Sequence, residues 1–295
     1  MKQYPVNFTT ISNGEKLAWR RCGEGGELIV LLHGNMSSSV HWQTTMEALE
    51  GDYRLFAPDL RGFGDSSYNN RLDSLLELAE DVKDLLTAEK IDNFTVVVWS
   101  TGGGIALELA ALMPDTVKKV ILLDSVALTG YPMFKKDAQG QAILTEPLLT
   151  KEDIAADPVQ VLPVLNAYAN GDKETMRAIW NAVIYNINQP PADDYELYLE
   201  AMLKQRNLVD VNYSLMTFNM TKNATPWAAG SGRMEKVVCP IVVLQGEKDL
   251  IVPLVWAQQI AKDFGEQATL ITFANAGHSL ITDDLQAFIE ALKTK

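Results

Sequence analysis

A serine lies where a short apolar run meets a glycine-rich turn. Ser100 follows the β-rich run Phe94–Trp99 and precedes Thr101-Gly102-Gly103-Gly104. A serine at such a strand-to-helix turn is held in a strained backbone conformation that lifts its hydroxyl clear of the sheet. The N–H of the next residue points toward the helix start, where an oxyanion is stabilised. The pattern predicts that Ser100 is a nucleophile, although a serine in this place could also simply cap the helix.

Valine stands two residues before this serine, where the turn favours a small side chain. We expect Gly103 and Gly104 to leave room for Val98 across the turn. This departure leaves the chemistry of the serine unchanged.

A serine hydroxyl is a weak nucleophile at neutral pH and needs a base, for which the chain offers 3 histidines. His278 lies between the last strand-like run and the last helix-like run, which favours it as the base. His33 ends the run Leu28–Leu32, and we expect it to hydrogen-bond the loops beneath the site. His41 begins a helix-like segment.

A carboxylate should hold the imidazole in the tautomer that accepts the proton. Asp249 follows the run Ile241–Leu244 and precedes His278 in the chain, so it is the preferred acid. Asp124 is the alternative acid, because it ends the run Val120–Leu123 and would lie at the same edge of a sheet. Glu247 is a weaker rival.

The turn His33-Gly34-Asn35-Met36 offers a second hydrogen-bond donor. A strand that stops at a glycine can present the following N–H inward, so we expect the amides of Asn35 and Thr101 to form a two-donor oxyanion hole. Apolar side chains should line the substrate pocket, although each could equally belong to the core. The candidates are Met36, Trp42, Trp99, Val126, Tyr131, Trp180 and Val252.

The elements that must position these residues alternate between short apolar runs and longer helical patterns, which is typical of a parallel sheet covered on both faces. The expected buried strands are Leu28–Leu32, Arg54–Ala57, Phe94–Trp99, Val120–Leu123, Ile241–Leu244 and Thr269–Phe273. Two more polar segments, Val6–Ile11 and Lys16–Arg21, predict an antiparallel hairpin at the sheet edge. The expected helices between the strands are Leu72–Glu89, Ile105–Leu112, Val255–Phe264 and Leu285–Leu292.

One stretch breaks the alternation. No strand is expected from about Val126 to Gly232, where breakers separate the helix-like segments Ile154–Tyr168, Glu174–Ile184 and Tyr195–Gln205. A long insertion between two core strands is usually a lid that shapes the substrate site.

The charge and cysteine content of the chain limit the kinds of molecule that it is expected to bind. The net charge of −13 and the pI near 4.7 argue against nucleic acid and against an anionic membrane surface, which both need clustered Lys and Arg. Two distant cysteines, Cys22 and Cys239, are too few for a disulfide scaffold. No long apolar stretch or N-terminal leader pattern is found, so we expect a cytoplasmic monomer or homodimer that acts on a small-molecule ester.

These motifs together resemble the α/β-hydrolase superfamily over almost the whole length. The motifs are His33-Gly34, Asp59-Leu60-Arg61-Gly62-Phe63-Gly64-Asp65-Ser66, the turn at Ser100, Gly246–Pro253 and Gly277-His278. The resemblance implies a mostly parallel eight-stranded sheet with helices on both faces. It also implies a helical cap after the sixth strand, which gives a core of residues 1–125 and 233–295 and a cap of residues 126–232.

Within that superfamily the chain is similar to bacterial intracellular short-chain polyhydroxybutyrate depolymerases. The likeness lies in His33-Gly34-Asn35-Met36-Ser37-Ser38-Ser39, in Trp99-Ser100-Thr101-Gly102-Gly103-Gly104 and in two strings of the expected cap, which start at Gly130 and Gln205. It implies a Ser-His-Asp esterase that acts on short-chain hydroxyalkanoate esters or oligomers, with no cofactor and no metal.

Other activities share this scaffold. Haloalkane dehalogenases and epoxide hydrolases resemble the chain but need an aspartate at the position of Ser100, so they are disfavoured. Lactone hydrolysis, C–C bond hydrolysis and a perhydrolase side activity use a similar triad and stay open. A non-catalytic receptor for a small apolar ligand is the alternative from a different class.

Overall fold

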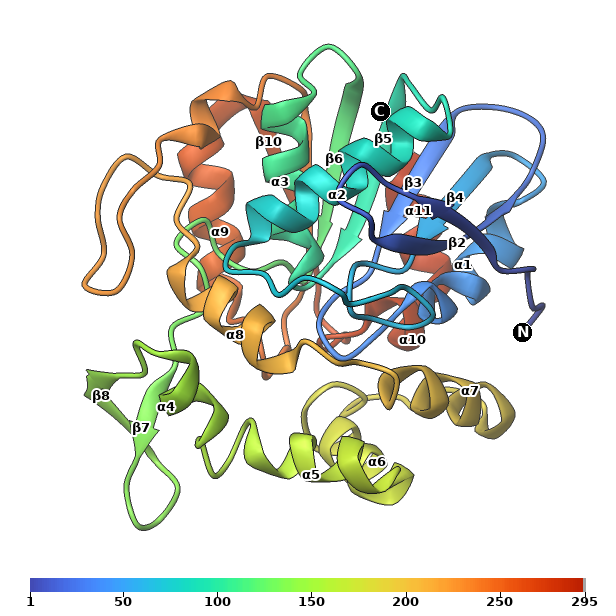
Figure 1. Cartoon of the computed structure of the whole chain (residues 1–295). Helices are drawn as coiled ribbons and strands as arrows, with labels where there is room; N and C mark the ends of the chain where they lie inside the picture. The colour runs from blue at the N-terminus through green and yellow to red at the C-terminus, as the bar shows by residue number, and fades with distance from the viewer. Residues whose placement is uncertain (294–295) are drawn as a thin grey trace.

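A single mixed sheet of eight strands forms the centre of the computed structural model, which describes residues 1–293 (Figure 1). Its order is β1-β2-β4-β3-β5-β6-β9-β10. The antiparallel pairs are β1 with β2 and β2 with β4, and all other neighbours run parallel. The strands are β1 (Asn7–Thr10), β2 (Lys16–Cys22), β3 (Leu28–Leu32), β4 (Arg54–Pro58), β5 (Phe94–Trp99), β6 (Val117–Leu123), β9 (Ile241–Gly246) and β10 (Ala268–Phe273). The predicted fold class and edge hairpin are confirmed.

Burial follows each strand's place in the sheet. All six residues of β5 are buried, as its continuous apolar run predicts. The expectation of a fully buried strand is wrong for β10, where Thr269 and Thr272 are exposed. The reason is that β10 is an edge strand with a single neighbour, so its two faces are only partly covered.

Helices cover both faces of the sheet (Figure 1). One apolar cluster joins the sheet to α2 (Leu75–Ala88), α3 (Gly102–Leu112) and α9 (Leu254–Phe264). A second cluster joins the other face to α1 (Gln43–Leu49) and α11 (Leu285–Lys293). Along β5, Val96 enters the first cluster and Val97 the second, as the two-residue period of a strand requires.

The segment between β6 and β9 lies at the carboxyl edge of the central strands (Figure 1). Its helices are α4 (Lys151–Ala155), α5 (Leu162–Asn170), α6 (Lys173–Val183), α7 (Ala192–Met202) and α8 (Leu208–Thr217). The single helix expected over Ile154–Tyr168 is divided into α4 and α5 around Asp157-Pro158, because proline disfavours helical backbone in the residue before it. The sequence pattern did not indicate α8.

The expectation that this segment contains no strand is wrong. A hairpin forms from β7 (Phe134–Lys136) and β8 (Ala142–Pro147). Its turn is closed by Asp137 Oδ1, which accepts from the backbone N–H groups of Gln139 and Gln141 at 2.9 Å each. No residue of either strand is buried, and the adjacent apolar residues Ile143 and Leu144 do not alternate with polar ones, so the hairpin lacks the period-two pattern that reveals a half-buried strand.

No helix within residues 1–293 combines the length and the apolar character that crossing a membrane requires.

Candidate active site

The turn between β5 and α3 holds Ser100 in a left-handed backbone conformation, with φ of 55°. This conformation costs a non-glycine residue about 1–2 kcal/mol and therefore needs support from its surroundings. The Ser100 N–H donates to the Leu123 carbonyl at 2.9 Å, and the Ser100 carbonyl accepts from the N–H of Gly103 at 2.9 Å. Gly34 packs so closely that a Cβ there would lie 3.0 Å from the Cβ of Ser100. The turn therefore presents the serine side chain at the carboxyl edge of the sheet.

Gly102 is the glycine nearest to Val98, although a Cβ there would approach the carbonyl oxygens of His33 and Leu32 more closely, at 2.9 and 3.0 Å. The expectation that Gly103 and Gly104 face Val98 is wrong, because neither has Val98 among its nearest neighbours. A Cβ on Gly102 would lie 3.4 Å from the Cβ of Val98. Gly103 faces Ser125 instead, and Gly104 faces a different helix and loop. Successive helical residues point about 100° apart, so only one of the three glycines can face the strand.

His278 and Asp249 form a buried pair. His278 Nδ1 lies 2.8 Å from Asp249 Oδ2, and both side chains are almost fully buried. Asp249 Oδ1 accepts from the N–H groups of Ile251 and Val252 at 2.7 and 2.9 Å, which fixes the carboxylate in its turn after β9. Trp99 Nε1 donates to the His278 carbonyl at 2.7 Å and holds the histidine loop against β5.

The charge balance around His278 favours its protonated form. Burial alone would lower the pKa of His278, but the attraction of Asp249 and its hydrogen bond outweigh burial and raise the pKa above its usual value. A histidine with an adjacent carboxylate is suited to take up a proton and hold it as an imidazolium.

Asp124, the alternative acid, lies in the same region but makes a different set of contacts. Its Oδ1 accepts from the Gly246 N–H at 2.8 Å, and its buried Oδ2 has no hydrogen-bond partner within the described chain. Burial, followed by repulsion from Asp249, raises the pKa of Asp124 to about 8. The structure therefore pairs His278 Nδ1 with Asp249 and places Asp124 beside that pair as a carboxyl that favours its neutral form.

Glu247, the weaker rival, points to the far side of its turn. Its Oε1 accepts from the Thr272 hydroxyl at 2.7 Å, on the exposed surface of β10.

The other two histidines are engaged in structural contacts. His33 Nε2 accepts from the Leu60 N–H at 3.0 Å, and its Nδ1 lies 2.8 Å from the Gly34 carbonyl. Burial lowers the pKa of His33, so it stays neutral and ties the two loops together. His41 stacks on Tyr198, with ring centroids 4.5 Å apart, and burial lowers its pKa to about 3.

Two backbone donors remain uncommitted next to Ser100. The N–H groups of Asn35 and Thr101 have no acceptor among residues 1–293, and both residues line the same pocket as Ser100. The neighbouring Met36 N–H is already engaged, because it donates to Asn35 Oδ1 and to Gln205 Oε1 at 3.0 Å each. The geometry leaves free the two donors that the sequence pattern indicated.

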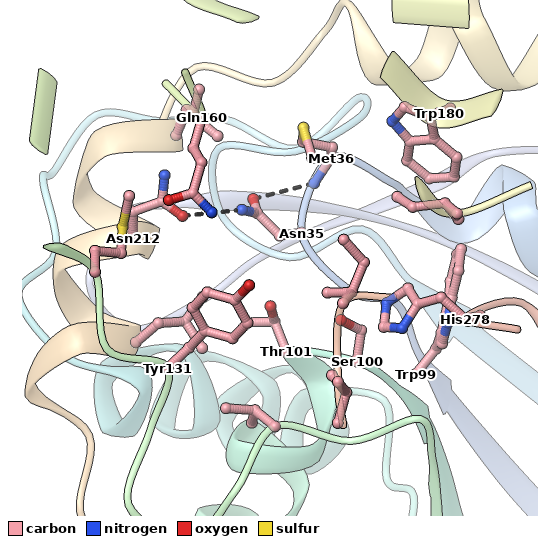
Figure 2. Close-up of a pocket in the computed structure, with 18 residues that line it drawn as sticks. Asn35, Met36, Trp99, Ser100, Thr101, Tyr131, Gln160, Trp180, Asn212 and His278 are labelled. Atoms are coloured by element: carbon pink, nitrogen blue, oxygen red, sulfur yellow. Dashed lines mark hydrogen bonds between the residues drawn. The ribbon is translucent and has the colours of Figure 1, made fainter. Parts of the chain in front are cut away.

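A cavity of about 120 Å³ opens above Ser100 and includes His278 in its wall (Figure 2). The structure brings together there the predicted lining residues Met36, Trp99, Val126, Tyr131, Trp180 and Val252. Trp42 does not reach the cavity, because it is fully buried beneath α11 and packs against Phe288.

Several residues of the cavity wall were not predicted from the sequence. They are Met133, Gln160, Ile184, Leu208, Asn212, Leu215 and Ile251. Most of them come from the segment between β6 and β9, where no local motif marks a residue as facing the sheet. The apolar period of α8 is the signal that would have indicated Leu208 and Leu215.

Comparisons with known proteins match the chain to a hydrolase family and to esterases and lipases. The family described as alpha/beta hydrolase fold matches residues 27–285. The chain is 28% identical to a pimeloyl-(acyl-carrier protein) methyl ester esterase of Nitrosomonas europaea, covering 87% of this chain and 90% of the relative. It is 26% identical to Lipase 1 of Psychrobacter immobilis, over 92% of this chain and 78% of the relative. The fold is similar to that of an esterase from Exiguobacterium antarcticum, with a TM-score of 0.73, 19% identity and 97% of each chain covered.

Proposed function

We propose that this chain, which belongs to the alpha/beta hydrolase family, hydrolyses carboxylic esters through an acyl-enzyme on Ser100. The observation that carries the proposal is the convergence of three features on one cavity. These are a strained serine, a histidine paired with a buried carboxylate at 2.8 Å, and two uncommitted backbone N–H groups. The named esterase and lipase relatives support the same class of reaction.

In the first half-reaction, Ser100 Oγ attacks the ester carbonyl carbon while His278 Nε2 takes the hydroxyl proton. The carbonyl π electrons move onto oxygen, and the N–H groups of Asn35 and Thr101 donate to that oxyanion. Each such donor contributes about 3 kcal/mol to the stabilisation of the transition state. Asp249 stabilises the imidazolium and holds its orientation. Collapse of the intermediate breaks the C–O bond to the alcohol, which leaves with the proton from His278.

In the second half-reaction, water takes the place of the departed alcohol. His278 Nε2 accepts a proton from the water as its oxygen attacks the acyl carbon. The bond to Ser100 Oγ then breaks, and the imidazolium returns the proton to the serine. The products are a carboxylic acid and an alcohol, and the free enzyme is regenerated.

The size of the cavity favours a short acyl group. A cavity of about 150 Å³ holds one benzene molecule, and this one measures about 120 Å³. Short-chain hydroxyalkanoate esters or oligomers are the finer part of the proposal, supported by the motif likeness to the polyhydroxybutyrate depolymerase-like subgroup. Residues 126–232 would then act as the cap over the acyl site, and the reaction would take place in the cytoplasm.

The test is hydrolysis of p-nitrophenyl esters from acetate to dodecanoate by the wild-type protein and by Ser100→Ala, with and without a serine-directed fluorophosphonate. We expect turnover that peaks at short chains and is lost in Ser100→Ala and after labelling, while the far-UV spectrum of the variant is unchanged. Ester hydrolysis that persists in Ser100→Ala would refute the proposal. Labelling of Ser100 without ester turnover would instead point to a lactone or C–C bond substrate, and neither labelling nor turnover to a ligand-binding scaffold.

A further inference from the structure

The two ends of the cavity above Ser100 differ in chemistry. At the end next to His278 the wall is aromatic, formed by Trp99 and Trp180 with ring centroids 5.9 Å apart. Asn212 and Gln160 lie at the opposite end, beyond the serine (Figure 2). The site therefore has one aromatic end beside His278 and an opposite end where the amides of Asn212 and Gln160 lie with Tyr131.

Hydrogen bonds fix which atom of the Asn212 amide is free. Asn35 Oδ1 accepts from the Met36 N–H at 3.0 Å and from Gln205 Nε2 at 2.8 Å, so its Nδ2 faces Asn212. That Nδ2 donates to Asn212 Oδ1 at 3.2 Å. The remaining group, Asn212 Nδ2, has no acceptor in the part of the chain that the structure describes, and it is available to a ligand.

Gln160, like Asn212, has its amide oxygen engaged by the protein. Its Oε1 accepts from Lys136 Nζ at 3.2 Å, which turns its Nε2 toward the hydroxyl of Tyr131 in the same part of the cavity wall. The charge of Lys136 is balanced by Asp157 Oδ2 at 2.8 Å, in a pair whose side chains are 7% and 1% exposed. The amide end of the cavity therefore offers hydrogen-bond donors without offering a free positive charge.

No Asp, Glu, Lys or Arg side chain lines the cavity among residues 1–293. A carboxylate or an ammonium group buried at the amide end would lose its hydration without gaining a partner of opposite charge there, because His278 lies at the other end of the cavity and is paired with Asp249. A hydroxyl or a carbonyl oxygen pays a far smaller desolvation cost and can accept from the amide donors. The wall is thus suited to a neutral ligand with an acceptor oxygen.

The proposed mechanism sets the direction of the ester. His278 must protonate the leaving alcohol, so the alcohol lies on the His278 side of Ser100 and the acyl chain extends toward Asn212. We propose that the site selects neutral esters whose acyl chain carries a second oxygen, as a hydroxyl or a carbonyl, and that Asn212 is a specificity-determining residue that donates to this oxygen. This inference rests on the proposed esterase function.

The test compares phenyl esters whose acyl groups have nearly the same shape. One pair is 3-hydroxybutanoate and 3-methylbutanoate, and the other is 4-oxopentanoate and 4-methylpentanoate. The measured quantity is the ratio of kcat/KM within a pair, divided by the same ratio for alkaline hydrolysis so that intrinsic reactivity cancels. We expect the wild-type protein to favour the oxygen-bearing member of at least one pair by about five- to tenfold, as one neutral hydrogen bond allows.

Asn212→Leu removes the donor at nearly constant volume, and we expect it to bring the normalised ratio to within about twofold of unity. Gln160→Leu serves as a second variant, because Gln160 is exposed and its replacement does not threaten the fold. It should lower the ratio by a smaller factor. The matched control is Asn170→Leu, an exposed asparagine at the end of α5, which should keep the wild-type ratio.

A third pair tests the neutrality of the site. Phenyl hydrogen succinate carries a carboxylate, whereas methyl phenyl succinate does not, and we expect the neutral diester to react at least about tenfold faster. Equal rates for these two esters, a wild-type ratio near unity in both isosteric pairs, or a preference that survives in Asn212→Leu would overturn the inference while leaving Ser100-dependent ester hydrolysis intact. The proposed function fails separately, if the 3-methylbutanoate and 4-methylpentanoate esters are not hydrolysed in a Ser100-dependent manner.

Discussion

Replacing Asp124 by asparagine removes a buried carboxyl whose pKa is raised, so that its neutral form is favoured at pH 7. The side chain is 0% exposed, one oxygen accepts from the Gly246 N–H, and the other has no partner in the described chain. Asparagine keeps the shape and the acceptor, and it cannot ionise. We therefore expect Asp124→Asn to stabilise the protein at neutral pH and to leave most of the ester hydrolysis intact.

The size of this effect follows from the raised pKa. Burial, with repulsion from Asp249, raises the pKa of Asp124 to about 8, whereas an aspartate in an unfolded chain has a pKa of about 3.9. At pH 7 the unfolded state therefore gains about 4 kcal/mol from ionisation that the folded state lacks. An asparagine NH2 left without an acceptor at the same place would cost about 1–3 kcal/mol. The expected net stabilisation of Asp124→Asn at pH 7 is about 1–3 kcal/mol.

The dependence on pH gives the sharper test. Because the folded pKa lies above the unfolded one, the penalty is absent below about pH 4 and grows as the pH rises toward 8, by about 1.4 kcal/mol per unit. The difference in unfolding free energy between Asp124→Asn and wild type should thus increase by about 3 kcal/mol from pH 5 to pH 7. Urea denaturation of both proteins at the two pH values measures this difference, and the exposed Asp92→Asn serves as the control that should show no such trend.

Two results would refute the reasoning. A difference between Asp124→Asn and wild type that is the same at pH 5 and pH 7 would mean that Asp124 is ionised in the folded protein. A loss of turnover as large as that of Asp249→Asn would mean that Asp124 is the acid that orients His278.

Four further predictions concern the proposed catalytic pair and the residues that support the site. In the wild type, kcat/KM should fall as the pH drops through an apparent pKa above about 6.5, because His278 must be neutral to act as a base. In Asp249→Asn, kcat should drop by about four orders of magnitude, and the acidic limb of a pH–rate profile should move to lower pH because the carboxylate that raises the pKa of His278 is gone. His33→Ala should lower the free energy of unfolding by about 3 kcal/mol in urea titrations, since it leaves a buried N–H unpaired and opens a cavity, and an unchanged stability with complete loss of turnover would contradict its structural role. Gly34→Ala should reduce kcat more than it raises KM, because the added methyl would lie 3.0 Å from the Cβ of Ser100; steady-state kinetics that match wild type would show that the turn has room to spare.

Much of the fold was predictable because its signals are local. The bounds of β3 and β5 match the apolar runs that predicted them, since a strand buried on both faces must be apolar at nearly every position. The chain-order positions of Ser100, Asp249 and His278 were also predictable, because each lies in a short turn that directly follows a strand. Parallel strands bring their carboxyl ends to one edge, so the sequence alone placed the three residues near one another.

The hairpin of β7 and β8 was not predictable by the same means. No residue of the hairpin strands is buried, and their few apolar residues do not alternate with polar ones, so no hydrophobic period distinguishes the strands from a loop. Asp249 and Asp124 follow neighbouring strands, so both carboxyl groups lie near His278. The three-dimensional course of the turn after β9 determines that it is Asp249 whose carboxylate reaches His278 Nδ1.

The sequence by itself determined the class of fold, the candidate nucleophile and base, and the edge of the sheet where they meet. Only the tertiary structure decided which glycine lies nearest to Val98, which carboxyl favours its neutral form, and that Asn35, Gln205 and Asn212 join in one amide chain. The physical reason is the range of the interactions. Hydrophobic period and turn chemistry act over a few neighbouring residues, whereas burial and side-chain hydrogen bonding depend on segments more than 100 positions apart, such as Asn35 and Asn212 at a separation of 177.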